Sequence, residues 1–242
     1  MVTSYLAAWK GPVLESDDPY NDGKTNNQAK VIKHVQDILY IDNHIQEIKS
    51  ALSKYGPVQS SMFVSDPENG DGDDANYNKI SNGYFSNEKR KSNHDIVIVG
   101  YDDHYKKGNF NTKPPDDGAY IVKNSWGSSW GEEGYFYVSY YDKNIGDDSL
   151  VFLNVEAPDN YKNIYQHDEA GVTTVFGFDN QNYGYMANVF MKKKAIEFLE
   201  GISFYTLNRD TKYELFVVED YNEVDNLNAK KRLVGQGTIK HR

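Results

Sequence analysis

The spacing of apolar and polar positions predicts a chain that is rich in strands and poor in helix. One helix is clear, over Ile45–Tyr55, because its apolar residues recur every three or four positions. These apolar residues are Ile45, Ile48, Leu52 and Tyr55. Asn43 and Gln46 have the spacing of a capping box, and the Gly-Pro pair after Tyr55 ends the helix. A second amphipathic helix is expected at Ser4–Trp9.

Runs of β-branched and aromatic residues between turn residues predict strands through the rest of the first 157 residues. The predicted strands are Val58–Val64, Ile96–Tyr101, Ala119–Lys123 and Gly134–Tyr141. Two polar stretches, Asp66–Asn82 and Asp102–Gly118, are predicted to be long surface loops.

A turn-like stretch, Ala157–Asn160, marks a predicted boundary between a domain of residues 1–157 and a domain of residues 158–242. Most of the net negative charge lies in the first domain. The second shows only strand patterns, which favour an all-β sandwich. Its predicted strands are Val172–Phe178, Asn188–Lys192, Ile196–Leu207, Lys212–Glu219 and Leu233–Lys240. Because the chain stops directly after the last of these, we expect an incomplete sandwich.

Composition excludes several classes of function. The net charge of -10 is unsuited to general binding of nucleic acid, which requires a positive surface. No run approaches the ~18 to 20 apolar residues of a membrane span, and no signal peptide is visible at the N-terminus. The chain has 0 cysteines, so it contains no disulfide, no thiolate metal site and no cysteine nucleophile.

Two groups of residues carry a chemical pattern. His94 precedes the apolar strand Ile96–Tyr101, and Asn124 follows the next strand, just before two Trp-Gly pairs at Trp126 and Trp130. A thiol nucleophile needs an imidazole beside it, and an asparagine carbonyl can hold that ring by accepting its other N–H. An indole two residues after the asparagine would keep water from competing for that hydrogen bond.

These residues resemble the papain-like cysteine peptidases. The run Lys-Asn-Ser-Trp-Gly-x-x-Trp-Gly-x-x-Gly-Tyr over residues 123–135, after a strand-borne histidine, matches the His and Asn motifs of that family. The upstream segments that resemble the family are Tyr5–Leu6, Gly11–Glu15, Asp18–Tyr20 and Gly56–Val58. Ser4–Pro12 and Tyr161–Gly177 resemble bacterial cell-surface members that carry a lectin-like β domain. The resemblance implies an α+β fold, in which the later, β-rich part of a papain-like domain is followed by a partial lectin-like sandwich.

The resemblance also implies roles for individual residues. His94 matches the catalytic base, Asn124 its orienting residue, Trp126 the shielding indole and Trp130 the second tryptophan of the cleft. The catalytic cysteine and the oxyanion-hole glutamine of the family have no counterpart, so we expect the chain to begin inside the peptidase domain and to be inactive alone. The implied reaction is hydrolysis of a peptide or protein substrate, without metal or organic cofactor, in a secreted or cell-surface protein.

Several alternatives stay open or are less favoured. The runner-up function is non-catalytic binding of cell-wall glycan or a surface protein by a peptidase remnant. Asp95 departs from the small apolar residue that the family has after its histidine, and its carboxylate either adds negative field or faces solvent. The acidic run Asp66–Asp74 lacks the spacing of a calcium-binding loop and favours a solvated loop. Lys192–Lys194 is too short for a nucleic-acid patch.

Overall fold

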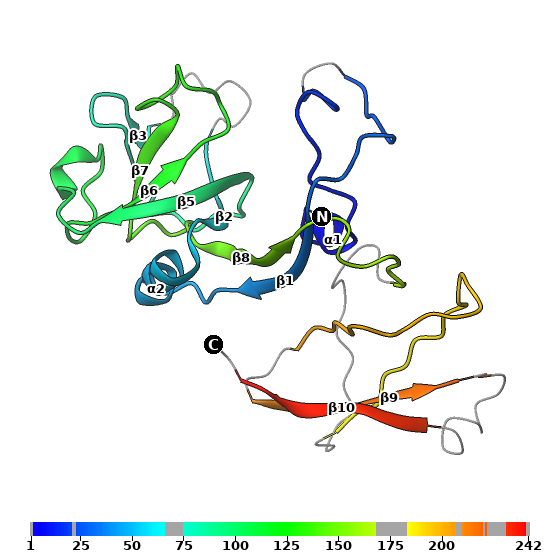
Figure 1. Ribbon diagram of the computed structural model, residues 1–242. Coiled ribbons are helices and arrows are strands. Elements are labelled where there is room, and N and C mark those ends of the chain that lie inside the picture. Colours follow the sequence, from blue (N-terminus) through cyan, green and yellow to red (C-terminus); the bar gives the residue numbers. More distant parts are fainter. Residues whose placement is uncertain are drawn as a thin grey trace. The chain divides into compact units, whose positions relative to one another are not determined.

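Figure 1 shows the computed structural model of the chain, which describes residues 2–20, 23–65, 75–167, 183–206, 210–219, 221 and 231–240. The chain separates into two compact units. One unit is Tyr5–Tyr161, and the other joins Met1–Ser4 to Lys162–Arg242. The change of unit lies a few residues after the domain boundary predicted at residue 157, and the domain limits themselves stay a prediction.

The unit Tyr5–Tyr161 is built on one eight-stranded sheet (Figure 1). In spatial order its strands are β1 (His34–Tyr40), β8 (Asp147–Glu156), β2 (Val58–Met62), β5 (His94–Asp102), β6 (Ala119–Lys123), β7 (Tyr135–Ser139), β4 (Gly83–Tyr84) and β3 (Tyr77–Asn78). Neighbouring strands are antiparallel except β4 and β7, which are parallel. A short 3₁₀ helix, η1 (Lys107–Asn109), lies in the long loop between β5 and β6.

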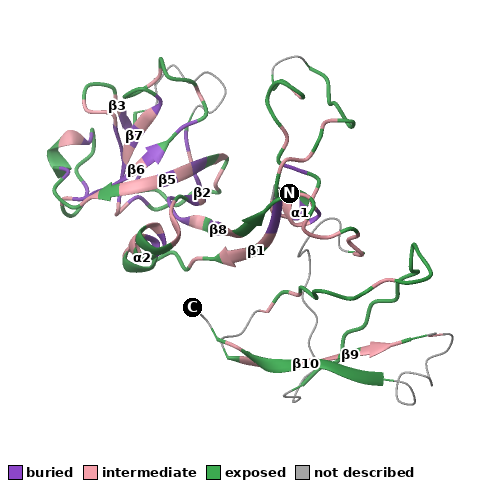
Figure 2. Ribbon diagram, in the orientation of Figure 1, coloured by how far each residue is buried: buried purple, intermediate pink, exposed green. Residues whose placement is uncertain are grey.

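Helix α2 (Ile45–Tyr55) lies against β2, β5 and β8 and has the bounds that its apolar spacing predicts. Its inner face places Ile48 and Ala51 in the main hydrophobic core, where Ile48 is fully buried. Alternate residues of the central strands enter the same core, among them Ile96 and Ile98 of β5. Figure 2 shows buried stretches in several strands of this sheet, β2 and β6 among them. The core therefore fixes the strand from which His94 extends.

The capping box predicted for α2 is wrong. The N-cap residue is His44, and it makes no side-chain capping hydrogen bond. Asn43 instead donates its side-chain amide to the carbonyl of Ile145, 3.0 Å away. The amide is used for a tertiary contact, and Glu47 in the first turn supplies the negative charge that favours a helix N-terminus.

Most of the other predicted elements in residues 1–161 differ from the prediction at their ends. Helix α1 spans Val2–Ala7, which is earlier than the predicted helix, and β2 ends two residues before Val64. Strand β6 has its predicted bounds, whereas β5 begins earlier, at His94 itself. Strands β1 and β8 were not predicted, although their antiparallel pairing extends the sheet at one edge.

The second unit has much less regular structure. Its described residues form one antiparallel pair, β9 (Thr211–Val218) with β10 (Lys231–Ile239), close to the two strands predicted there. The strands predicted at 188–192 and 196–207 are wrong for the described residues, because 183–206 contain no strand. The apolar side chains on which these two predictions were based are largely exposed to solvent. Apolar and β-branched residues favour a strand mainly through packing against neighbours, which is largely absent here among the described residues. The strand predicted at 172–178 lies outside the described residues.

The fold class predicted from the resemblance, α+β, is confirmed by this mixture of a large sheet and few helices. Among the described residues, no helix has the length and apolar character needed to span a bilayer.

Candidate active site

His94 is the first residue of β5, and its backbone is held by the neighbouring strand β2. It pairs with Met62 of β2 in the antiparallel register, and Met62 is fully buried. The preceding residue, Asn93, continues this pairing with its side chain. The Asn93 amide accepts from the Val64 N–H at 2.9 Å and donates to the Val64 carbonyl at 2.9 Å. The side chain of Asn93 therefore extends the contact between β5 and β2 beyond His94, where the backbone pairing of the two strands ends.

Asn124 directly follows β6, the strand next to β5, at the base of a loop that returns to β7. Its backbone N–H donates to the carbonyl of Gly134 at 2.9 Å, which closes the loop. The residue is 8% exposed, so its amide is largely shielded from water. The pairing of β5 with β6 brings Asn124 next to His94.

The two side chains meet through a single oxygen. Asn124 Oδ1 lies 2.9 Å from His94 Nε2, and it also accepts the backbone N–H of Ser125 at 2.8 Å. A backbone N–H is always a donor, so the Asn124 atom that it reaches must be the oxygen. His94 Nε2 must then carry the proton, which leaves Nδ1 of the neutral ring as a proton acceptor.

The Asn124 amide is incompletely satisfied. Its Nδ2 is buried and has no hydrogen-bond partner among the described residues. Burying an unpaired donor costs free energy, so the arrangement is maintained by the two bonds to Oδ1 and by the surrounding packing.

Trp126 covers this pair. Its indole stacks on the His94 ring with centroids 4.9 Å apart and an interplanar angle of 30°. Trp130 does not stack on His94. It packs edge-on against Trp126 at 5.0 Å and stacks on Tyr77 at 5.0 Å, so it connects the shielding indole to the core.

Glycine is required at one turn of the loop that carries these indoles. Gly131 has a φ of +59°, and a Cβ built on it would lie 2.5 Å from the backbone carbonyl oxygen of Tyr135. No side chain fits at that distance. The close approach lets the Glu132 N–H donate to the same Tyr135 carbonyl, at 2.8 Å.

Comparison with known families matches most of the chain. Residues 2–152 match the papain family of cysteine proteases, and residues 164–242 match the lectin-like domain. The chain belongs to the papain family of cysteine proteases. The resemblance drawn from the His94 and Asn124 motifs, and from the segment that follows the peptidase domain, is confirmed.

Individual relatives agree with this membership. The chain is 29% identical to cysteine proteinase 1 of Zea mays over 154 residues, which is 61% of this chain and 38% of that protein. It is 30% identical over 134 residues to the viral cathepsin of Choristoneura fumiferana nuclear polyhedrosis virus, covering 53% of this chain and 35% of that protein. The chain thus spans well under half of either relative.

Two solved structures of one bacterial protein are also similar to the chain. The cysteine protease and lectin-like domains of Cwp84, a surface layer associated protein of Clostridium difficile, share 35% identity and a TM-score of 0.61 with this chain. That match covers 70% of this chain and 38% of the Cwp84 chain. A second Cwp84 structure, determined after propeptide cleavage, matches with 34% identity and a TM-score of 0.62 over 70% of this chain and 43% of that chain.

Asp95, the residue at which this sequence departs from the papain-family pattern, is exposed. Its Oδ1 accepts a hydrogen bond from the Ser61 hydroxyl at 2.7 Å, on the neighbouring strand β2. The carboxylate therefore faces solvent and is held beside β2.

No serine among the described candidates takes the place of the missing thiol. Ser60 is fully buried and shares a 2.9 Å hydrogen bond with Ser149. Ser61 is bonded to Asp95, and Ser125 contributes its backbone N–H to Asn124. Within the described residues, none of these hydroxyls hydrogen-bonds to His94. The described residues therefore bring an imidazole and a side-chain amide together, and none of these three serine hydroxyls is bonded to the imidazole.

The sequence did not point to the structural roles of Asn93, whose amide pairs with Val64, and of the buried Asn144, whose amide pairs with Glu88 and Arg90. Asparagines in turn-like stretches are usually solvated, and only the pairing of their amides with distant backbone reveals a structural role.

Proposed function

We propose that this chain supplies the base and its orienting residue to a papain-type cysteine peptidase site. The observation that carries the proposal is the Asn124 oxygen, which accepts both the Ser125 N–H and His94 Nε2. This arrangement fixes the His94 tautomer that has Nδ1 free to take a proton. Trp126 shields that hydrogen bond and forms one wall beside the base, and Trp130 supports Trp126 by packing edge-on against it.

The proposed chemistry follows from that tautomer. His94 Nδ1 takes the thiol proton, which gives a thiolate–imidazolium pair, and the thiolate attacks the peptide carbonyl carbon. The imidazolium then gives this proton to the leaving amine nitrogen as the C–N bond breaks. A water attacks the resulting thioester while His94 takes its proton, and the thiol is released with that proton. Asn124 keeps the ring in one orientation throughout and is not itself protonated.

The thiol must come from outside these 242 residues, because the chain contains 0 cysteines. Sequencing the DNA upstream of the Met1 codon is the first test. An in-frame glutamine followed by a Gly-x-Cys-Trp-like motif supports the proposal. An in-frame stop codon with a start site at Met1 contradicts it and favours the non-catalytic remnant.

Kinetics of the chain extended by those upstream residues provide the second test. We expect hydrolysis of a generic peptide substrate by the extended chain and none by residues 1–242. In the extended chain, His94→Ala should lower kcat/KM by several orders of magnitude, and Asn124→Ala by less, because the base takes part in every proton transfer. Turnover that survives His94→Ala unchanged would contradict the proposal.

We further propose a cell-surface location and a binding role for the lectin-like region. The support is the match of residues 164–242 to the lectin-like domain and the likeness to Cwp84, which is a surface layer associated protein. The expected ligands are cell-wall glycan or a surface protein. Binding of the purified chain to isolated cell walls, compared with walls stripped of protein, would test the location and distinguish the two ligands.

A further inference from the structure

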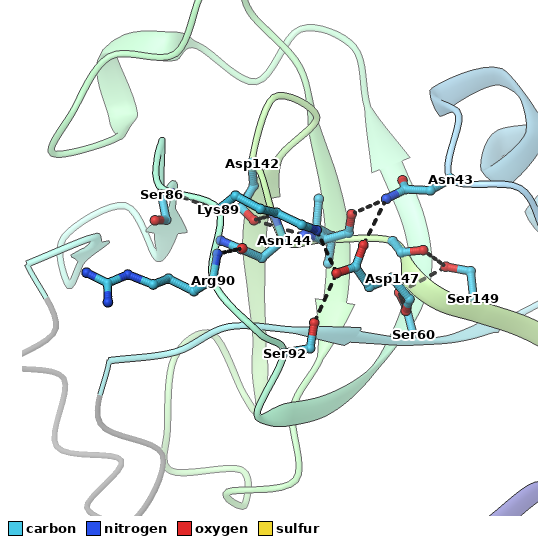
Figure 3. Close-up of polar contacts among 12 residues, drawn as sticks. Asn43, Ser60, Ser86, Lys89, Arg90, Ser92, Asp142, Asn144, Asp147 and Ser149 are labelled. Atoms are coloured by element: carbon cyan, nitrogen blue, oxygen red, sulfur yellow. Dashed lines mark hydrogen bonds and ion pairs between the residues drawn. The ribbon is translucent and has the colours of Figure 1, made fainter.

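A group of buried polar side chains lies beside the segment that leads into β5. Figure 3 shows residues 86–92, which precede His94, running along the loop 142–147 between β7 and β8. Two side chains of that loop are almost inaccessible to solvent, since Asp142 is 7% exposed and Asn144 is 0% exposed. Buried polar groups of this kind are retained where each of them finds partners.

Asp142 holds the beginning of the segment. Its Oδ2 accepts the backbone N–H of Ser86 at 2.7 Å, and its Oδ1 accepts the N–H groups of Asn144 and Ile145 at 2.8 and 2.9 Å. The Ser86 carbonyl accepts in return from the Lys143 N–H at 3.1 Å. Burial raises the pKa of the Asp142 carboxyl, and the three amide donors oppose that rise. The carboxylate thus joins the segment to the tight turn that follows β7.

Asn144 holds the middle of the segment with both ends of its amide. Its Oδ1 accepts the Arg90 backbone N–H at 2.7 Å, and its Nδ2 donates to the Glu88 carbonyl at 2.9 Å. These two bonds have the pattern of a strand pair, but the side chain replaces one of the two backbones. The Arg90 N–H and the Glu88 carbonyl thereby have hydrogen-bond partners, although residues 86–92 do not pair with a strand.

Asp147 holds the end of the segment. Its Oδ2 accepts from the Lys89 ammonium at 2.7 Å and from the Ser92 hydroxyl at 3.3 Å. Ser92 is only two residues before His94, and Asn93 then bonds to Val64. Most residues from Ser86 to Asn93 therefore have a contact that holds them before the chain enters β5.

We propose that Asp142, Asn144 and Asp147 are positioning residues, which clamp residues 86–92 to residues 142–147. This clamp sets how His94 meets Asn124 and Trp126. The His94 ring must satisfy two demanding contacts at once, the 2.9 Å bond to Asn124 and the stack on Trp126. A backbone that moved by about 1 Å at the strand start would lose one of them, since hydrogen bonds weaken steeply outside their usual distances. The position of His94 therefore depends on the segment 86–92 that leads into β5. The clamp is the buried group of side chains that holds this segment.

The clamp matters for catalysis only if the proposed function holds, so its test avoids turnover. The chain of residues 1–242 is labelled with 15N and 13C at histidine, and the His94 ring signals are followed by NMR. In the parent chain we expect an Nε2–H tautomer and ring protons displaced by the ring current of Trp126. In Asn144→Ala we expect the displacement to fall by more than half, with exchange of the Arg90 amide faster by about tenfold, the effect of losing one buried hydrogen bond.

The matched control is Asn160→Ala. The Asn160 side chain also makes several contacts, to His34, to Glu156 and to the Tyr161 N–H, but none to residues 86–92. We expect it to change the His34 signals and to leave those of His94 in place. His94 signals that stay unchanged in a folded Asn144→Ala chain would overturn the proposal. Equal displacement of His94 by Asn160→Ala would also overturn it, because the effect would then be general destabilisation.

Two milder variants decide the matter if Asn144→Ala does not fold. Lys89→Met and Ser92→Ala each remove one contact to Asp147 near the surface, and each should displace the His94 signals to a smaller degree. No displacement in both would overturn the clamp. If the His94 NMR signals shift in these variants but the extended chain has no peptidase activity, the clamp is supported and the proposed function is refuted.

Discussion

At the scale of single residues, the side-chain oxygen of Asn124 determines which nitrogen of the His94 ring carries the proton. The Ser125 N–H donates to Asn124 Oδ1, and this bond fixes the orientation of the side-chain amide so that its oxygen, and not its nitrogen, faces His94. Asn124 is therefore more than a hydrogen-bond partner, since its orientation selects the histidine tautomer.

Replacing Asn124 by alanine should release that tautomer. We expect the His94 ring to change from predominantly Nε2–H to a mixture of both tautomers, because no acceptor then favours a proton on Nε2. Stability should fall by about 2 kcal/mol, the usual effect of losing two hydrogen bonds, those to His94 and to the Ser125 N–H. Nitrogen-15 shifts of the ring and urea unfolding measure the two effects. Asn124→Asp, which retains the acceptor, should preserve the Nε2–H tautomer, and a mixture in that variant would argue against this role of the oxygen.

Gly131 allows a second prediction at this scale. Gly131→Ala should destabilise the chain by about 1–3 kcal/mol, because the new Cβ meets the Tyr135 carbonyl and the backbone stays at positive φ. The fluorescence of Trp126 and Trp130 should shift as their loop moves. Gly108→Ala is the matched control, since a Cβ there has open space, and equal losses in the two variants would refute the steric argument.

At the scale of elements, a cation joins α2 to the far end of β5. The Lys49 ammonium pairs with Asp103 and lies 4.8 Å from the Tyr101 ring centroid and 4.5 Å from that of Tyr140. Tyr140 also donates its hydroxyl to Asp103 at 2.8 Å. The hydrogen bond from Lys49, and then that from Tyr140, lowers the pKa of the Asp103 carboxyl.

This lowered pKa gives a pH dependence with a definite sign. A carboxyl whose folded pKa is depressed contributes stability above its unfolded pKa of about 3.9, and that contribution disappears as pH falls through the folded pKa. Asp103→Asn should therefore cost about 0.5–1 kcal/mol at pH 7, within the range of partly exposed pairs, and progressively less below about pH 4. Denaturant unfolding of both chains at a series of pH values measures this. A cost that grows on acidification would contradict the assignment.

The helices and strands also show which elements the sequence pattern predicts and which it does not. The α2 bounds and β6 were predictable because their apolar residues follow one period and meet one core. Strand β1 was not predictable because its buried and exposed positions do not alternate along the strand. The His94–Asn124 contact was predictable from a motif. The Asp142 and Asn144 clamp was not, since nothing in a polar turn reveals which distant backbone it will bond.

At the scale of the whole molecule, the two units differ in how they use apolar residues. Every buried residue among those described lies in Tyr5–Tyr161 or next to it, at Ser4. In Lys162–Arg242, large apolar side chains are exposed, with Met191 at 89%, Phe198 at 84% and Ile196 at 79%. An isolated two-stranded ribbon such as β9–β10 is marginal by itself.

Hydrogen exchange should therefore separate the two units. Amide protection depends on buried, paired backbone, so β5, β6 and the core-facing turns of α2 should exchange only through global unfolding. Residues 183–206, which form no strand, should exchange with little protection, and the β9–β10 amides should fall between these limits. Fragment-resolved mass spectrometry after labelling for seconds to hours measures this order. As an internal control, the exposed residues 111–113 should exchange as fast as 183–206, because both lie outside any strand ladder. Protection of 183–206 equal to that of β5 would show that these apolar residues are covered in solution, and the second unit would then have a core of its own.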